Sequence, residues 1–276
     1  MFAKLLKHEF RAQKKTFFIL SIAALGVGIL GSLLLWMIVS SSVSTMSDAS
    51  SVIIAAFGTL GLLGIILALL AYVLAIQIIL WVRFYRHHFT GEGYLTFTLP
   101  VTTTQILWAS IVNIVIWIFI STLVFALSIG IILIPALVEV MKEMDWKTFF
   151  DSFREAFLSM QEVYEEVGLN VFTYIFSGIA SFISRITLPL LCITIGSIIA
   201  KKHKLLASFG IYYGINMAIS IISGILSAVA TLADTVSDFS RVFSFSIVMP
   251  GVIQLCVGIG SYCLMHYLIS KKLNLQ

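Results

Sequence analysis

Long apolar segments, separated by short polar ones, dominate this sequence. Six of them contain almost no charged side chain, and they cover residues 16–39, 52–82, 106–137, 170–200, 205–232 and 244–269. A helix needs about 20 residues to cross the hydrocarbon of a bilayer, and each of these segments is at least that long. The pattern predicts an all-α, polytopic membrane protein with six transmembrane helices, which form a single transmembrane domain over residues 1–276.

Composition agrees with this interpretation. The chain is 60% hydrophobic and only 11% charged, whereas soluble proteins carry about 25% charged residues. An ordinary soluble domain is therefore excluded.

Lysine and arginine are unevenly distributed between the two sets of connections. With the N-terminus placed inside, 12 of the 17 cations fall in inside segments and four in outside segments, while Arg185 lies within a span. Of the 13 acids, only Glu9 and Glu92 fall inside. Because cytoplasmic segments are enriched in Lys and Arg, we expect a multi-pass protein of the cell membrane with both termini in the cytoplasm.

The first 15 residues can form a helix with one apolar and one basic face. The apolar side chains are Phe2, Leu5, Leu6 and Phe10, and the cations are Lys4, Lys7, Arg11, Lys14 and Lys15. This pattern predicts an interfacial helix on anionic lipid over residues 1–15, and a disordered basic tail that only sets orientation is the alternative. A cleaved signal peptide is disfavoured, since the apolar segment that follows exceeds the core of about 7–15 residues typical of a signal.

The longest outside connection, residues 138–168, is both acidic and aromatic. Large apolar side chains recur in it at helical spacing and alternate with acids; they are Trp146, Phe149, Phe150, Phe153, Phe157, Met160 and Tyr164. We expect an amphipathic helix between spans three and four that lies on the outer interface or against projecting span ends. A structural cap and a lid that contacts substrate both remain open.

The sequence lacks the common motifs of nucleotide and metal chemistry. It contains no GxxxxGK[ST] phosphate loop and no HExxH zinc motif, and no acids, histidines and cysteines converge within the spans. Cys192, Cys256 and Cys263 lie in apolar segments, where buried structural thiols are expected. Dispersal of the cations over helix ends argues against nucleic-acid binding. The chain is therefore not expected to be an enzyme or to hold a cofactor or metal, and any ATP would be bound by another chain.

Four of the predicted spans each contain one amide side chain. These residues are Gln77, Asn113, Asn216 and Gln254. A polar group is costly against lipid, so each must face protein or a wet cavity. Hydrogen bonds between helices and a translocation path both account for such groups, and the two alternatives stay open.

Arg185 is the one full charge deep within a predicted span. It precedes Ala200 by 15 residues, about 22 Å along a helix, which places it toward the outer part of the hydrocarbon. It would extend toward the outer surface or meet an acid of the outer connection. We therefore predict a structural or gating ion pair, and Pro189, one turn later, predicts a helix kink.

The connection after the second span, residues 83–105, is the only sizeable one on the inner side. It begins with Arg83, Arg86, His87 and His88. Adjacent histidines point in different directions on a helix and are poor joint metal ligands. The four side chains are instead expected to form a cationic collar that faces the lipid headgroups.

The rest of this connection combines turn signals with a short apolar segment. Glycines flank Glu92 and allow sharp changes of direction. An apolar segment too short to span follows and ends at Pro100; its large side chains are Tyr94, Leu95, Phe97 and Leu99. Thr102 and Gln105 have the spacing of a capping box, which predicts the start of the third span. Exposed aromatic groups on a loop favour insertion into a groove of a partner.

Residues 91–105, GEGYLTFTLPVTTTQ, resemble the segment after the second span in type-2 ABC exporter permeases of Gram-positive bacteria. Those proteins often carry an acid–small–Tyr–Leu–Thr–Phe–Thr–Leu–Pro–Val run there. The basic N-terminal segment KLLKHEF, the C-terminal KKLNLQ and the six-span layout are also similar. The resemblance implies a coupling helix that docks on an ATPase, formed by Glu92, Gly93, Tyr94, Leu95, Thr96, Phe97 and Pro100.

The resemblance also implies a function and a set of partners. The chain would be the permease subunit of an exporter that moves a hydrophobic or amphipathic substrate (a peptide, lipid or drug) by alternating access. Two separate ABC ATPase subunits would bind ATP and Mg²⁺, and a second copy or a homologous permease would complete the pore, with spans two and five at the dimer face. Membrane lipid, and not nucleic acid, is the remaining partner. The alternative is a non-transport membrane protein, such as an immunity or sensor component, which would need no coupling segment.

Overall fold

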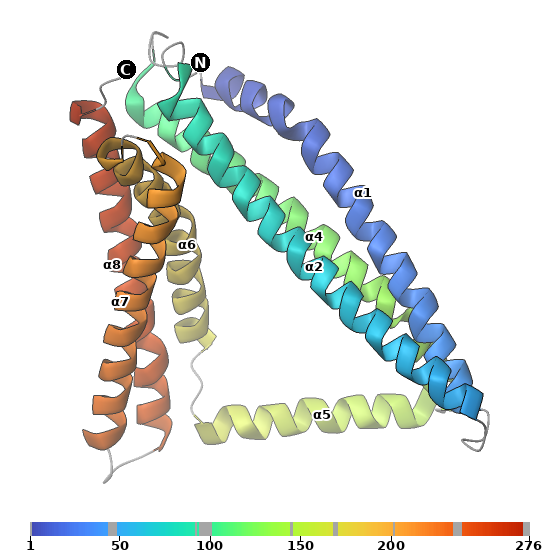
Figure 1. Ribbon diagram of the computed structural model, residues 1–276. Coiled ribbons are helices and arrows are strands. Elements are labelled where there is room, and N and C mark those ends of the chain that lie inside the picture. The colour runs from blue at the N-terminus through green and yellow to red at the C-terminus, as the bar shows by residue number, and fades with distance from the viewer. Residues whose placement is uncertain are drawn as a thin grey trace. The chain divides into compact units, whose positions relative to one another are not determined.

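The computed structural model describes residues 2–43, 49–91, 93, 101–143, 146–167, 171–200, 202–233 and 239–272. These residues are almost entirely helical, and no strand occurs among them. The helices are α1 (Phe2–Val43), α2 (Ala49–Phe89), α4 (Thr103–Glu143), α5 (Trp146–Val167), α6 (Val171–Ile199), α7 (Lys204–Ala233) and α8 (Phe239–Lys272) (Figure 1). The predicted all-α fold is confirmed.

Within the described ranges, six helices are long and apolar enough to cross a membrane, and they are α1, α2, α4, α6, α7 and α8. They correspond in order to the six predicted spans, so the chain is compatible with a multi-pass membrane protein. Several helices continue beyond the apolar segments. For example, α2 ends at Phe89 rather than at residue 82, because polar residues without Gly or Pro do not interrupt a helix.

The basic N-terminal segment is helical from Phe2, so a disordered tail is wrong for residues 2–15. It is not a separate helix, because α1 runs from Phe2 to Val43 without a break. No Gly or Pro lies between Phe2 and Leu25 to interrupt it. Its position on the lipid interface stays a prediction.

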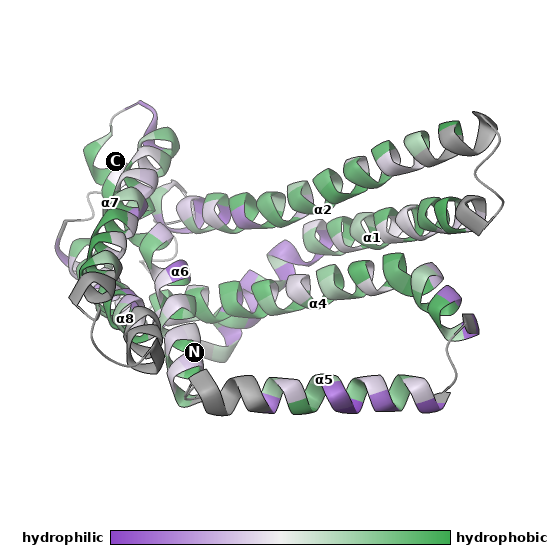
Figure 2. Ribbon diagram, turned by 90° about the horizontal axis from the view of Figure 1, so that it is seen from below, coloured by the Kyte–Doolittle hydropathy of each residue, from purple (hydrophilic) through white to green (hydrophobic). Residues whose placement is uncertain are grey.

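The amphipathic helix predicted between spans three and four is α5. Purple and green residues alternate along it in Figure 2, whereas α2 and α4 are green over most of their length. Its large apolar side chains, including Phe150, Phe153, Phe157 and Met160, are exposed. An uncovered apolar face suits a helix on an interface, and both the cap and the lid remain open.

The chain divides into two compact units. The N-terminal unit comprises Lys4–Leu80 and Val112–Arg154. The C-terminal unit comprises Met1–Ala3, Trp81–Ile111 and Glu155–Gln276. Because α1, α2, α4 and α5 each contribute residues to both, the boundary passes through helices rather than through linkers. The single domain over residues 1–276 stays a prediction.

Small residues bring α1, α2 and α4 together in the N-terminal unit. A Cβ atom on Gly61 of α2 would lie 2.8 Å from Leu34 of α1, and one on Gly28 of α1 would lie 3.1 Å from the Ser128 backbone of α4. Gly58 has a similarly close neighbour in Ile38, whereas Gly64 has open space around it. Glycines permit such close backbone approach in helical membrane proteins.

In the C-terminal unit, α6, α7 and α8 lie side by side (Figure 1). A Cβ atom on Gly251 of α8 would lie 3.1 Å from Ser177 of α6, and one on Gly196 of α6 would lie 2.8 Å from the Ser208 backbone nitrogen of α7. The Thr187 hydroxyl donates to the Gly258 carbonyl at 3.1 Å. These contacts accompany the burial of α6 on all sides over residues 186–194.

The cysteines only partly follow the expectation of buried thiols. Cys192 of α6 is buried, but Cys256 and Cys263 of α8 are exposed. The reason is the position of each residue on its helix. Cys192 lies within residues 186–194, where α6 is buried on all sides, whereas the other two share an exposed side of α8 with Val252 and Ile259.

Candidate functional site

The last turns of α2 differ from the predicted cationic collar. His88 is 0% exposed, and its Nδ1 lies 3.0 Å from the Phe84 carbonyl, to which it donates if protonated there. His87 is also buried, whereas Arg86 is exposed. The collar is therefore wrong for both histidines. Phe84, His87 and His88 share one face at helical spacing, and all three side chains are buried.

A tight turn follows α2. The Gly93 amide donates to the Thr90 carbonyl at 2.8 Å. A Cβ atom on Gly93 would lie 2.5 Å from the His88 carbonyl oxygen and 2.8 Å from its carbon, while one on Gly91 would have nothing within 4 Å. The turn therefore requires glycine at Gly93 for steric reasons and not at Gly91.

The remaining predicted coupling residues lie outside the described part of the chain. They are Glu92, Tyr94, Leu95, Thr96, Phe97 and Pro100. Their helical conformation and their role stay predictions. The structure describes instead the two helix ends that flank them.

The start of α4 is capped as the sequence predicts. The helix begins at Thr103, and the Gln105 amide lies 3.4 Å from the Thr102 hydroxyl oxygen. Thr104 and His266 of α8 share a hydrogen bond of 3.1 Å between Oγ1 and Nε2. Trp108 also packs on Tyr262 of α8, with ring centroids 5.6 Å apart. The start of α4 therefore contacts α8.

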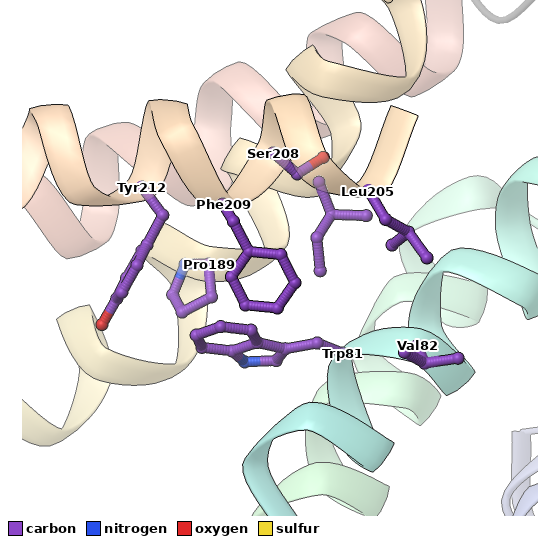
Figure 3. Close-up of a pocket in the computed structure, with 8 residues that line it drawn as sticks. Trp81, Val82, Pro189, Leu205, Ser208, Phe209 and Tyr212 are labelled. Atoms are coloured by element: carbon purple, nitrogen blue, oxygen red, sulfur yellow. The ribbon is translucent and has the colours of Figure 1, made fainter. Parts of the chain in front are cut away.

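The end of α2 contacts α6 and α7 through Trp81 (Figure 3). The indole lies 5.3 Å from the Phe209 ring and 5.1 Å from the Tyr212 ring, centroid to centroid. Pro189 of α6 borders the same small pocket. Sequence reasoning missed Trp81, although a tryptophan two residues before Arg83 at the end of an apolar segment was a usable signal.

These contacts have one consequence for the segment between Gly93 and Val101. The end of α2, which precedes this segment, packs on α6 and α7. The start of α4, which follows it, packs on α8. Both belong to the C-terminal unit. A displacement of this segment would therefore act on α6, α7 and α8 through side chains in direct contact.

Asn113 takes part in a hydrogen bond between two helices. Its amide nitrogen donates to Oε1 of Gln13 in α1 at 3.2 Å, and both residues are buried. Trp117, one turn along α4, stacks on Phe10 and Phe17 of α1 with centroid distances of 4.7 and 4.2 Å. Of the two interpretations of Asn113, helix packing is the one that these contacts support. Gln13 was missed because the basic segment around it suggested a lipid surface.

We expect the Asn113–Gln13 pair to contribute about 1 kcal/mol to stability. Asn113→Ala and Gln13→Ala should each destabilise by about this amount, and the double variant should cost little more than one of them, since either change removes the same bond. Unfolding in mixed detergent micelles measures these differences. Gln254→Ala serves as control, because Gln254 makes no side-chain hydrogen bond to the described residues. Strict additivity would contradict the pairing.

The other amides have different surroundings. Asn216 donates to the Tyr212 carbonyl of its own helix at 2.9 Å. Gln77 and Gln254 are half-buried, and neither has a side-chain hydrogen bond within the described ranges. Gln77 and Asn113 belong to the N-terminal unit, and Asn216 and Gln254 to the C-terminal unit. A translocation path lined by the four amides stays a prediction.

Arg185 is exposed on α6. Neither the ion pairs nor the hydrogen bonds formed among the described residues include its side chain. The structural or gating ion pair therefore stays a prediction.

The described residues contain no group of three His, Cys, Asp or Glu side chains that could hold a metal ion. They include the end of α2 and the start of α4, both of which contact helices of the C-terminal unit. A scan against protein-family models and searches of curated proteins and of solved structures found no match.

Proposed function

We propose that this chain is the transmembrane permease subunit of an ABC exporter in the cell membrane. It moves a hydrophobic or amphipathic substrate by alternating access, with both of its termini in the cytoplasm. Two ATPase subunits bind ATP and Mg²⁺ and supply the energy, so the chain itself is not an enzyme. A second permease copy or a homologue completes the pore.

The anchoring of both helix ends around residues 94–100 carries this proposal. An ATPase that pushes on a coupling helix must move membrane helices, not only a loop. Trp81 connects the preceding helix end to α6 and α7, and Trp108 connects the following one to α8. Aromatic contacts at both ends give a short, stiff route for that force.

A face of α7 that none of the described residues covers supports a second permease subunit. A Cβ atom on Gly210 or Gly214 would have nothing within 4 Å apart from the backbone of its own helix. Leu206, Tyr213 and Met217 beside them are between 68% and 73% exposed. Because GxxxG faces permit close helix contact, this face suits the dimer contact that the resemblance implies for span five.

Replacing Glu92 and Tyr94 together with alanine tests the coupling assignment. We expect normal membrane insertion and ATPase association weakened about tenfold or more, because the few side chains that dominate an interface each cost about 2 kcal/mol or more when truncated. ATP-dependent transport should fall accordingly. The measurements are co-purification with the P-loop ATPase of a neighbouring gene and transport by the reconstituted complex.

Glu139→Ala is the matched control, since Glu139 is an acid at the opposite end of α4 that pairs only locally with Lys142. It should leave association unchanged. Transport at the wild-type level by the double variant would show that the segment does not couple. If no ATPase accompanies the wild-type chain at all, a non-transport role such as immunity or sensing takes precedence.

A further inference from the structure

Among the described residues, Arg185 has no partner for its charge. It lies 14 residues from each end of α6, or about 21 Å along the helix. A hydrocarbon core of about 30 Å therefore includes Arg185 whichever end of α6 is aligned with its boundary. An arginine at such depth must face water, a protein group or an anion, because lipid is a costly surrounding for it.

The membrane-spanning helices supply no acid to neutralise it. The sequences of α2, α6, α7 and α8 contain no Asp or Glu. In α1 the only acid is Glu9, near its start, and in α4 both acids, Glu139 and Glu143, lie in the last five residues. A negative partner at the depth of Arg185 must therefore come from outside these helices.

Polar groups of α7 lie at the same depth. Ser208 packs on Gly196, and Tyr212 borders a pocket with Pro189. Since α6 and α7 run in opposite directions, this register brings Asn216 to the level of Arg185. Arg185, Tyr212 and Asn216 thus combine a cation, a phenol and an amide on adjacent helices.

An apolar aromatic surface lies one turn away. Trp81, Phe209 and Tyr212 converge there beside Pro189 (Figure 3). A charged group next to an apolar, aromatic surface is the arrangement that binds an amphiphile, since the apolar surface holds the body and the polar groups orient the head. Arginine suits carboxylates and phosphates, which it binds through two parallel hydrogen bonds.

We propose that Arg185, Tyr212 and Asn216 form a recognition site for the anionic group of an amphiphile, a phosphate or carboxylate on an apolar body. That this amphiphile is the cargo rests on the proposed function. The anion site itself does not depend on it.

Bromine quenching of Trp81 tests this site. The full-length chain is placed in phosphatidylcholine nanodiscs and titrated with a bromine-labelled alkyl phosphate or with the uncharged alcohol of the same chain length. The difference between the wild type and Trp81→Phe isolates the signal of Trp81, whose ring lies 5.1 Å from Tyr212. We expect saturable quenching by the phosphate, with an affinity about ten- to hundredfold above that of the alcohol, as for a hydrogen bond to a charged group.

Substitutions then test whether Arg185 causes the preference for the alkyl phosphate over the alcohol. Arg185→Gln should abolish it, Arg185→Lys should retain part of it, and Lys142→Gln should leave it unchanged, because Lys142 is an exposed cation at the far end of α4. Equal affinities for phosphate and alcohol in the wild type would overturn the proposal, even if Arg185→Gln failed to insert. An undiminished preference in a folded Arg185→Gln protein would overturn it as well.

A second arm separates the two sources of an anionic head. Nanodiscs with bromine-labelled phosphatidylglycerol replace the soluble probe. If this lipid quenches Trp81 and the quenching depends on Arg185, a bilayer lipid is the ligand. If the alkyl phosphate quenches Trp81 and the lipid does not, a soluble amphiphile is the ligand. Both results support the anion site. Because this assay needs no ATPase, its failure leaves the permease proposal standing, and the lack of an ATPase partner leaves the anion site standing.

Discussion

Replacing Gly93 with alanine should open the turn that follows α2. The new Cβ would lie 2.5 Å from the His88 carbonyl oxygen and 2.8 Å from its carbon. These are backbone atoms in a helix, and they cannot move aside as the end of a side chain can. Overpacking of this kind costs about 1–3 kcal/mol, which exceeds the gain of about 1 kcal/mol from the hydrogen bond between Gly93 and Thr90.

Protease cleavage after residue 90 measures this opening. Inverted membrane vesicles expose the connection after α2 to protease if it is cytoplasmic. We expect the Gly93→Ala protein to be cleaved about tenfold faster than the wild type, because a local destabilisation of about 1.4 kcal/mol raises the open population about tenfold. Under the proposed function, transport should fall in parallel while insertion stays intact.

Gly91→Ala is the matched control, because a Cβ there meets no atom within 4 Å. Cleavage of this variant should stay within about twofold of wild type, as expected for a surface substitution worth less than about 0.5 kcal/mol. Similar cleavage of the two variants would show that the steric account of Gly93 is wrong.

Truncation of Trp117 to alanine should give the largest loss of stability in the N-terminal unit. The side chain is buried and its ring stacks on both Phe10 and Phe17. A buried aromatic-to-alanine change costs about 3–5 kcal/mol in soluble proteins, and each aromatic pair adds about 0.5–1.5 kcal/mol. In a membrane, lipid can cover part of the surface that the missing indole leaves exposed. We therefore expect Trp117→Ala to lower the free energy of unfolding by about 3 kcal/mol, the lower end of this range.

Thermal unfolding in detergent, followed by the loss of the monodisperse species, checks this value. Trp36→Ala is the control within the same unit, since Trp36 is 65% exposed on α1 and should change stability by less than about 1 kcal/mol. Residues 4–17 should also lose their protection from proteolysis in Trp117→Ala but not in Trp36→Ala. Equal effects of the two substitutions would argue that α1 is held by lipid rather than by α4.

Features that depend on neighbours along the chain could be predicted from the sequence. The six spans follow from apolar length, and the start of α4 follows from Thr102, whose hydroxyl caps the third residue of the helix. The amphipathic α5 follows from helical spacing of its aromatic residues. In each case the cause lies within one helix or one turn, so its signal is local.

Residues of the same type in similar local sequences nevertheless have different surroundings. Asn113 bonds to another helix while Asn216 bonds to its own, and Gly93 is confined while Gly91 is open. His88 is buried although Arg83 and Arg86 precede it. Apolar composition marks every face of a membrane helix alike, so it does not reveal which face meets protein and which meets lipid.

The amino-acid sequence determined that this chain forms long apolar helices and where one of them starts, and it marked the connection after the second span as the one that resembles a coupling segment. Only the tertiary structure decided that both flanks of that connection are held by α6, α7 and α8, and that Gly93 rather than Gly91 must be glycine. The physical reason is that backbone hydrogen bonds and hydrophobic length are satisfied within a helix, whereas close contacts such as that of Trp81 with Tyr212 depend on how separate helices meet.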